Sequence, residues 1–313
     1  MAHARPFRFG VQLASAMDAK GWTALARRAE DLGYSTLFVP DHFGDQLAPL
    51  PAMTAAAAAT STLRVGSLVF DNDFKHPVVM AKEAATLDLL SDGRLELGMG
   101  AGWMATDYTS SGMPMDPPAV RVERLEEAIH VLKGLFGTGP LSFQGNHYHI
   151  IELDGAPPPV QQPHPPLIIG GGGQRVLALA AREADVVGIN PSLAAGRIDA
   201  TTVQDAVGTA VDRKVAHVRT TAGNRYGDIE INLLVFACVI TDDRNGVLEA
   251  MAAPFGLEPS ELIDVPYVWV GSVEQICDQL IANRERWDAS YLVVQGEEAL
   301  TSAAPIVARL AGT

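Results

Sequence analysis

An aspartate and a histidine stand together in the segment VPDHFGD, directly after an apolar run. An imidazole titrates near neutral pH, and a preceding carboxylate can set its charge or its tautomer. Asp41 and His42 are therefore the best candidates in the chain for general acid–base catalysis. The plainer alternative is an aspartate that caps a helix beside a half-buried histidine, and the dipeptide by itself favours that alternative.

Four consecutive glycines, at 170–173, stand before Gln174, Arg175 and an amphipathic segment. Glycines let backbone N–H groups converge on an anion at the positively polarised start of a helix. A lone glycine run is as often a flexible turn, and the position between a strand and a helix favours a phosphate cradle. Arg175 is a candidate countercharge, or alternatively a solvated arginine in the first helical turn.

Glycine also occupies alternate residues from 98 to 102, which removes side chains from one side of a strand end. A flat or bulky group could lie there. Trp103 and Met104 follow at once, and together with Met113 and Met115 they indicate an apolar, adaptable pocket. Each of these four side chains could equally belong to the core.

The candidate residues follow apolar runs of the kind that form buried parallel strands, and such runs alternate with amphipathic helical segments. Eight alternating units predict a (β/α)8 TIM barrel, with residues 1–313 as a single domain. The predicted strands begin near residues 7, 36, 63, 95, 167, 186, 231 and 291. Active sites of such barrels form at the carboxyl ends of the strands, so the candidates should share one rim.

Two segments interrupt this alternation. Residues 139–151 carry two short strand-like runs around the turn QGN and predict a small hairpin insertion. Residues 191–228, after strand six, predict an irregular insertion that could act as a mobile lid or select the substrate. His147 and His149 alternate along the hairpin, a spacing that metal sites use, but no third ligand stands near them in sequence. We therefore expect no metal.

The composition, with 48% hydrophobic and 19% charged residues, is typical of a soluble globular protein. No apolar run reaches the ~18 residues of a membrane span. The start MAHARPFRFG lacks an apolar signal segment, so we expect a cytoplasmic protein with Cys238 and Cys277 reduced. A net charge of −14 argues against nucleic acid and anionic membrane as partners.

Three blocks, in order along the chain, carry a family resemblance: HP at 76–77, AKEAATLDLLSDGR at 81–94 and GxGxGW at 98–103. They resemble the luciferase-like monooxygenase superfamily, especially the branch that uses the deazaflavin coenzyme F420. The resemblance spans nearly the whole chain and implies a homodimeric, F420-dependent oxidoreductase that exchanges a hydride with a small organic substrate. One alternative is an FMN-dependent monooxygenase that activates O2. A third reading is a protein that binds either cofactor without turnover.

The resemblance also implies roles for single residues. His42 would take the substrate proton, and a non-proline cis peptide would join Leu68 and Val69 behind the ring system. Lys75 and His76 would meet the anionic tail of the cofactor, although His76 could instead be only a hydrogen-bonded residue before Pro77. The cofactor-binding set would be Asp41, Leu68, Val69, Lys75, His76, Gly100, Gly102, Gly171, Gly172, Gly173, Arg175, Gly188 and Ile189.

The chain departs from the F420-dependent sugar-phosphate dehydrogenases at Trp103, where they carry a glutamate that serves as proton donor. This departure argues against a 6-phosphosugar substrate and assigns Trp103 and Met104 to an apolar substrate pocket. Coenzyme F420 is itself polyanionic. A local groove rich in cations or N–H groups must therefore overcome the repulsion from the net charge of −14.

Overall fold

Parallel strands close into a barrel in the computed structural model, which describes residues 5–255 and 258–313. Neighbouring strands pair in the order β3-β2-β1-β13-β10-β9-β8-β5, and a pairing of β3 with β5 closes the ring. The barrel strands are β1 (Arg8–Gln12), β2 (Thr36–Val39), β3 (Arg64–Ser67), β5 (Leu95–Gly100), β8 (Leu167–Gly171), β9 (Val186–Ile189), β10 (Glu230–Val235) and β13 (Ala289–Gln295). The (β/α)8 barrel and its eight predicted strands are confirmed.

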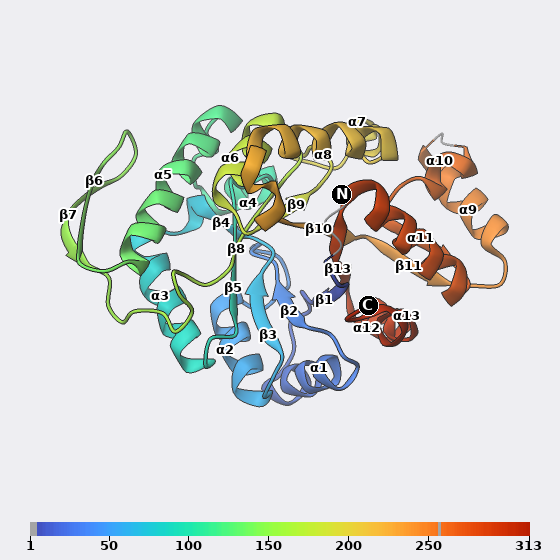
Figure 1. The fold of residues 1–313 in the computed structure, drawn as a ribbon, viewed down its shortest axis with the longest axis horizontal. Helices are drawn as coiled ribbons and strands as arrows, with labels where there is room; N and C mark the ends of the chain where they lie inside the picture. Colours follow the sequence, from blue (N-terminus) through green and yellow to red (C-terminus); the bar gives the residue numbers. More distant parts are fainter. Residues whose placement is uncertain (1–4, 256–257) are drawn as a thin grey trace.

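Helices surround the barrel and cover the strands from outside (Figure 1). In α5 (Pro118–Phe136), Leu125, Ile129 and Leu132 recur at helical spacing and are buried against the strands. Within residues 5–255 and 258–313, no helix combines the length and the apolar character needed to cross a membrane. The other helices that cover the barrel are α1 (Ala19–Asp31), α2 (Pro49–Ala59), α3 (Pro77–Leu90), α6 (Gln174–Glu183), α8 (Gly208–Ala222), α11 (Val273–Trp287), α12 (Glu297–Ser302) and α13 (Ala304–Leu310).

The predicted strand at 231–240 divides into two. Its second half, β11 (Ala237–Ile240), leaves the barrel and pairs in parallel with β12 (Val268–Gly271), which the sequence did not reveal. The carbonyl of Tyr267 accepts the N–H groups of Phe236 and Ala237 at the division. Beyond β11 lie α9 (Arg244–Ala252), the 3-10 helix η3 (Ala253–Phe255) and α10 (Pro259–Ile263), which has Pro259 at its first position.

The segment after β9 is more regular than predicted. Between residues 191 and 228 lie α7 (Ala200–Gln204), the barrel helix α8 and the 3-10 helix η2 (Gly223–Asp228). Asp199 caps α7, because its carboxylate accepts the N–H groups of Thr201 and Thr202. The irregular insertion is therefore limited to residues 190–199, and its role as a lid stays a prediction.

The predicted hairpin is confirmed as the antiparallel pair β6 (Pro140–Gln144) and β7 (His149–Asp154), which lies beside α5 at the left of Figure 1. Glu127 of α5 holds its turn. The carboxylate accepts the N–H groups of Asn146, His147 and Tyr148 at 2.6, 2.9 and 3.0 Å. Burial opposes ionisation of Glu127, but these bonds outweigh it and hold the pKa of the carboxyl below its ordinary value.

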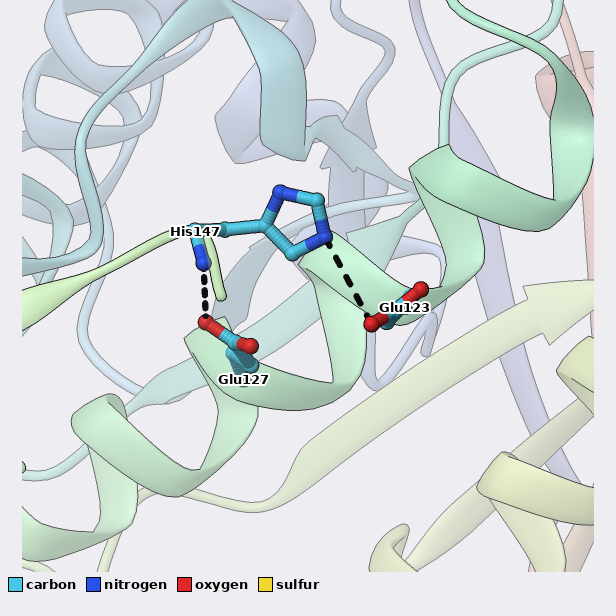
Figure 2. Close-up of side chains that lie close together, drawn as sticks. All are labelled: Glu123, Glu127 and His147. Atoms are coloured by element: carbon cyan, nitrogen blue, oxygen red, sulfur yellow. Dashed lines mark hydrogen bonds and ion pairs between the residues drawn. The ribbon is translucent and has the colours of Figure 1, made fainter. Parts of the chain in front are cut away.

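Glu123 and Glu127, both on α5, lie close enough to His147 in the folded chain for the three side chains to hold a metal ion (Figure 2). Its Nε2 atom is buried without a hydrogen-bond partner among the described residues and lies 4.0 Å from Oε1 of Glu123. His149 is exposed and belongs to no such group in the described part of the chain. Since both oxygens of Glu127 already accept backbone N–H groups, we assign the cluster to holding the hairpin. The expectation of no metal stays a prediction.

Replacing Glu127 by alanine should free the hairpin turn. Each hydrogen bond to a charged group contributes about 1.5–3 kcal/mol, so the amides at 146–148 should exchange with deuterium about 10- to 100-fold faster. Hydrogen–deuterium exchange followed by mass spectrometry measures this. Glu126→Ala is the matched control, because in the described part of the chain Glu126 pairs only with exposed Arg182, at 2.7 Å. Unchanged exchange in the Glu127 variant would contradict the assignment.

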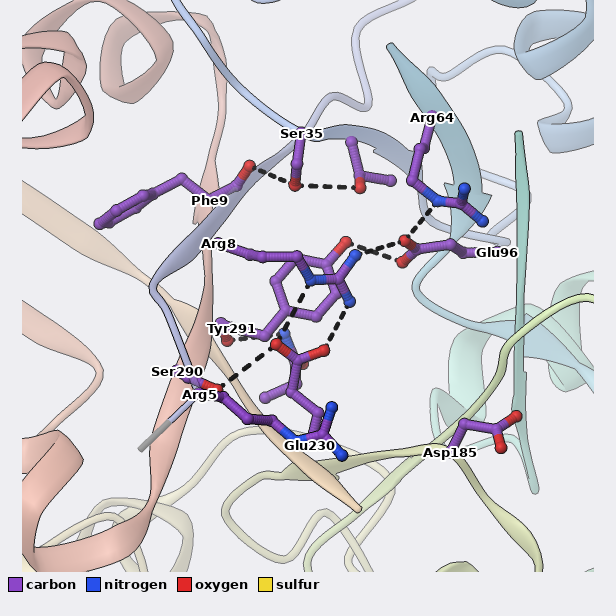
Figure 3. A network of polar contacts seen from close by, with 12 residues as sticks. Arg5, Arg8, Phe9, Ser35, Arg64, Glu96, Asp185, Glu230, Ser290 and Tyr291 are labelled. Carbon is purple, nitrogen blue, oxygen red and sulfur yellow. Dashed lines mark hydrogen bonds and ion pairs between the residues drawn. The ribbon is translucent and has the colours of Figure 1, made fainter. Parts of the chain in front are cut away.

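A buried ionic network closes the amino-terminal end of the barrel (Figure 3). Glu96 accepts hydrogen bonds from Arg8 at 2.7 Å, Arg64 at 2.8 Å and the Tyr291 hydroxyl at 2.8 Å. Glu230 forms a second ion pair with Arg8 at 2.7 Å. Apolar side chains fill the lumen next to this network: Phe38, Leu68, Ile168, Val186, Tyr291 and Val293. With the lumen filled, the carboxyl ends of the strands are the place for a ligand.

Candidate active site at the barrel mouth

His42 is paired with a carboxylate at the mouth of the barrel. Its Nδ1 atom lies 2.7 Å from Oδ2 of Asp107, whose other oxygen accepts the N–H of Phe43 at 3.3 Å. Asp107 is buried and His42 is partly exposed. The carboxylate fixes the ring and places the proton of the neutral imidazole on Nδ1. Nε2 is then left to exchange a proton with a bound molecule.

Asp107 is the residue that sequence reasoning missed. It lies on α4 (Ala105–Ser111), a short helix in the loop after β5. The sequence ATDYTSS is poor in strong helix formers, so propensity did not indicate the helix. A usable signal did exist, because Asp107 is the only carboxylate within that segment of the predicted rim.

Trp103 lies beside the pair. Its ring centroid is 5.7 Å from that of His42, in an edge-to-face arrangement with an interplanar angle of 89°. Met104 directly precedes α4. Phe43 is 51% exposed and packs against Phe74, with ring centroids 4.5 Å apart. One side of the mouth is therefore apolar around a single acid–base group, while the assignment of Trp103 and Met104 to a substrate pocket stays a prediction.

Asp41, which is partly buried, sits next to the buried carboxyl of Asp71. Asp41 Oδ2 accepts the N–H of Asp71 at 3.2 Å, and burial raises the pKa of Asp41. Burial, helped by the charge of Asp73, raises the pKa of Asp71 to about 7. The Tyr108 hydroxyl lies 3.0 Å from Asp71 Oδ2 and 2.9 Å from Asp73 Oδ2. Since the phenol has one proton, a protonated Asp71 can donate to it while it donates to Asp73.

Asp71→Asn should make stability less sensitive to pH. The folded-state pKa of Asp71 is raised to about 7, so the folded protein binds this proton more tightly than the unfolded chain. The stabilisation is complete below the unfolded pKa, about 4, and is lost as pH rises through the folded value. Asparagine cannot ionise, and the variant should gain in melting temperature relative to the parent between about pH 4 and 7. A constant difference across thermal melts in that range would refute the prediction.

The strand predicted at 63–70 is broken at the cis peptide between Leu68 and Val69, which confirms the bond that the family resemblance implied. β3 ends at Ser67, and a two-residue strand, β4 (Phe70–Asp71), continues along β5. The side-chain amide of Gln12 donates to the Leu68 carbonyl at 2.6 Å. The Gln295 amide donates in turn to Gln12 Oε1 at 3.0 Å. Leu68 and Val69 thus form part of the floor of the mouth.

The chain itself fills the space beside the alternate glycines. A Cβ on Gly98 would lie 1.9 Å from the Ser67 carbonyl oxygen, and one on Gly100 would lie 2.5 Å from Val69. Gly102 has a φ of +72°, and its Cβ would lie 1.9 Å from the Tyr108 hydroxyl. These glycines are required by local packing. The interpretation of this side as space for a flat ligand was wrong, although backbone contact of Gly100 and Gly102 with a cofactor stays a prediction.

The glycine run after β8 is partly packed and partly open. A Cβ on Gly171 would clash with Val176 at 2.3 Å, and one on Gly172 with the backbone of Pro191 at 2.4 Å. Gly173 meets nothing within 4 Å and precedes α6 without a side-chain cap. The unpaired N–H groups at this helix start form the open part of the predicted anion cradle.

The remaining cofactor candidates differ in exposure. Arg175 is exposed in the first turn of α6, so a countercharge and a solvated side chain both stay open. A Cβ added to Gly188 would lie 3.1 Å from the Cα atom of Gly170, so Gly188 is packed closely against that residue. The side chain of Ile189 is fully buried in the main hydrophobic core, so only its backbone could face a ligand.

Lys75 and His76 both have partners within the chain. The Lys75 ammonium group pairs with Glu83. His76 Nδ1 accepts the N–H of Val78 at 3.3 Å and caps α3, which is the alternative role named for it from the sequence. Both residues border a hollow of about 320 Å³ beside the 3-10 helix η1 (Asn72–Phe74), which Arg124 also lines. An anionic chain could reach Lys75 there only by competing with Glu83.

A (β/α)8 barrel with a histidine–carboxylate pair and an open helix start on one rim is the architecture of a small-molecule enzyme. The chain belongs to the luciferase-like monooxygenase family, whose sequence model matches residues 1–290. The resemblance inferred from the three sequence blocks is therefore confirmed.

Relatives within this family differ in cofactor. The chain is 32% identical over 135 residues to an F420-dependent glucose-6-phosphate dehydrogenase of Amycolatopsis mediterranei, covering 41% of this chain and 40% of the relative. It is 31% identical over 131 residues to an FMNH(2)-dependent dimethylsulfone monooxygenase of Pseudomonas putida, covering 42% of this chain and 36% of the relative. The chain thus spans well under two thirds of the length of these relatives.

Among solved structures, the chain is similar to the coenzyme F420 dependent tetrahydromethanopterin reductase of Methanopyrus kandleri. The TM-score is 0.78, with 98% of this chain and 100% of that chain covered. Sequence identity is 18%, so this similarity concerns the fold alone. Together the relatives indicate an oxidoreductase with a deazaflavin or a flavin as cofactor.

Proposed function

We propose that this protein is an F420-dependent oxidoreductase that transfers a hydride between the deazaflavin and a small organic substrate. The observation that carries the proposal is the His42–Asp107 pair, at 2.7 Å, on the same rim as the open start of α6. A two-electron hydride transfer to or from carbon needs a matching proton transfer. An imidazole oriented by a carboxylate meets that need near neutral pH.

The groups that would hold such a cofactor are mainly backbone groups, since the Lys75 ammonium is already paired with Glu83. The N–H groups around Gly173 would hold its phosphate, and Leu68 and Val69 would support the ring system from the floor of the mouth. When bound, the deazaflavin supplies the hydride chemistry. His42 would exchange the proton at Nε2, and Asp41 would contact the cofactor from the end of β2.

A titration of the purified protein with F420, and in parallel with FMN, tests the cofactor. Trp103 lies at the mouth, whereas Trp22, Trp269 and Trp287 are buried, so quenching of tryptophan fluorescence should come from Trp103. We expect micromolar binding of F420 and weak binding of FMN. Trp103→Phe is the control, since it should abolish the quenching. Binding of neither cofactor would refute the proposal.

An FMN-dependent monooxygenase that activates O2 is the second candidate function. The relative from Pseudomonas putida, named as FMNH(2)-dependent, favours it at nearly the same identity as the F420-dependent relative. A helix start binds the phosphate of either cofactor, so the glycine loop does not separate them. Preference for FMN in the titration would make oxygen activation the working mechanism.

We expect a small-molecule substrate, a cytoplasmic location and a homodimer. The neighbouring helices α2 and α3 offer a candidate surface for the dimer. The sequence of α2, PLPAMTAAAAA, has no charged residue. On neighbouring α3, Val79, Leu89 and Leu90 are 46%, 48% and 66% exposed. A second copy that covered these side chains would remove apolar area from water. Analytical ultracentrifugation should show a dimer that Leu90→Asp weakens, and a monomeric parent would exclude it.

A further inference from the structure

Phe236 stands directly after the strand β10, at the carboxyl-terminal rim of the barrel. Side chains alternate along a strand, and Leu234 packs against the lumen cluster that includes its paired residue Val293. Val235, paired with Val294, is buried in the main hydrophobic core and not in the lumen cluster. Continued by one residue past Val235, the same alternation would turn Phe236 toward the mouth, next to the position of Gln295 on β13. Its ring is 49% exposed.

The Phe236 ring is held from behind. The N–H of Phe236 donates to the Tyr267 carbonyl at 2.9 Å, where the chain leaves the barrel for β11. The two rings pack with centroids 5.7 Å apart and an interplanar angle of 38°. Tyr267 is buried, so it cannot move aside without opening the core. Phe236 therefore presents a fixed apolar surface, which lowers the entropic cost of binding a ligand.

The polar groups near this side of the mouth do not suit a phosphate. Gln12 and Gln295, which bond to each other at 3.0 Å, are neutral. Lys214, the buried cation next to the end of β9, donates to the Asn190 carbonyl, the Asp205 carbonyl and the Asp205 carboxylate at 2.9, 3.0 and 2.6 Å. An ammonium group has three N–H donors, so none remains for a ligand.

We propose that Phe236 is a specificity-determining wall of the substrate site, and that the substrate is a neutral, largely apolar molecule with an aromatic or alicyclic ring. The inference rests on the proposed function, because it places the substrate between the cofactor and this wall. Half-exposed Phe43 and partly buried Trp103 supply apolar surface elsewhere on the rim, around the acid–base pair. A ring bound on Phe236 would bury apolar area on both partners.

Fluorine NMR of protein made with fluorophenylalanine tests the inference without turnover. The chain has 10 phenylalanines, and the resonance absent from Phe236→Leu identifies Phe236. In the F420-loaded protein, acetophenone, a neutral aromatic ketone, should shift this resonance, and glucose 6-phosphate should not. Phe236→Ala should weaken acetophenone binding about tenfold. Ile240→Ala, at the exposed end of β11, is the matched control and should leave it unchanged.

Two results would overturn the inference: a Phe236 resonance that stays fixed while acetophenone binds, or one that responds to glucose 6-phosphate. No acetophenone binding at millimolar concentration would overturn it too. Failure of F420 to bind is a different outcome, because it refutes the proposed function. The acetophenone titration of the free protein then still decides whether Phe236 lines an apolar binding site.

Discussion

His42→Ala is expected to lower turnover by about 10²- to 10⁴-fold, the usual contribution of a positioned acid–base group. Binding of F420 should change little, because the phosphate cradle at α6 and the floor at Leu68 and Val69 are untouched. Steady-state rates with a reducible substrate, together with the fluorescence titration, measure both quantities. Unchanged turnover would remove His42 from the mechanism, and loss of cofactor binding would make it a binding residue instead.

Asp107→Asn tests whether the carboxylate orients the imidazole. An amide of the same shape can keep the 2.7 Å contact with Nδ1, but its NH2 group favours the other tautomer or a turned ring. We expect a loss of about 10²-fold or more in kcat with a small change in KM. Asp45→Asn, on the exposed part of the same loop as His42, is the control and should leave kcat unchanged. Equal rates for both variants would show that His42 acts alone.

The sequence was sufficient for the barrel because the pattern repeats. Barrel strands are buried on both faces, so runs such as 37–39 and 186–189 contain no polar side chain, and amphipathic helices such as α1 and α6 stand between them. Rim positions then follow from topology alone. The glycine loop and the Asp41-His42 pair could therefore be assigned to the mouth before any contact was known.

The parts that could not be predicted depend on tertiary contacts. Asp107 meets His42 across 65 residues of chain, on a helix whose sequence favours a loop. The division of 231–240 is set by the Tyr267 carbonyl, which lies 31 residues beyond Phe236 and leaves no trace in the local apolar pattern. The alternate glycines were read as ligand space because the sequence does not show that the Ser67–Val69 segment crosses them.

Glu96→Ala is expected to cost about 3–5 kcal/mol of the free energy of unfolding, because removing one partner of a buried ion pair leaves the others uncompensated. Arg8 and Arg64 would lose their bonds of 2.7 and 2.8 Å to this carboxylate, and the Tyr291 hydroxyl would lose its acceptor. Urea unfolding followed by circular dichroism measures the change. Glu126→Ala, which breaks an exposed pair, should stay within about 1 kcal/mol.

The pH dependence of stability separates the charge of Glu96 from its packing. Burial opposes ionisation of Glu96, but Arg8 and Arg64 outweigh it and hold its pKa below the ordinary value. The stabilisation from this group is therefore present above the unfolded pKa of about 4.3 and is lost as pH falls through the lower folded value. Glu96→Gln keeps the volume and an acceptor for Tyr291 but cannot ionise. The difference in unfolding free energy between parent and Glu96→Gln should be largest at neutral pH and shrink below about pH 4. A difference independent of pH would mean that shape, not charge, closes this end of the barrel.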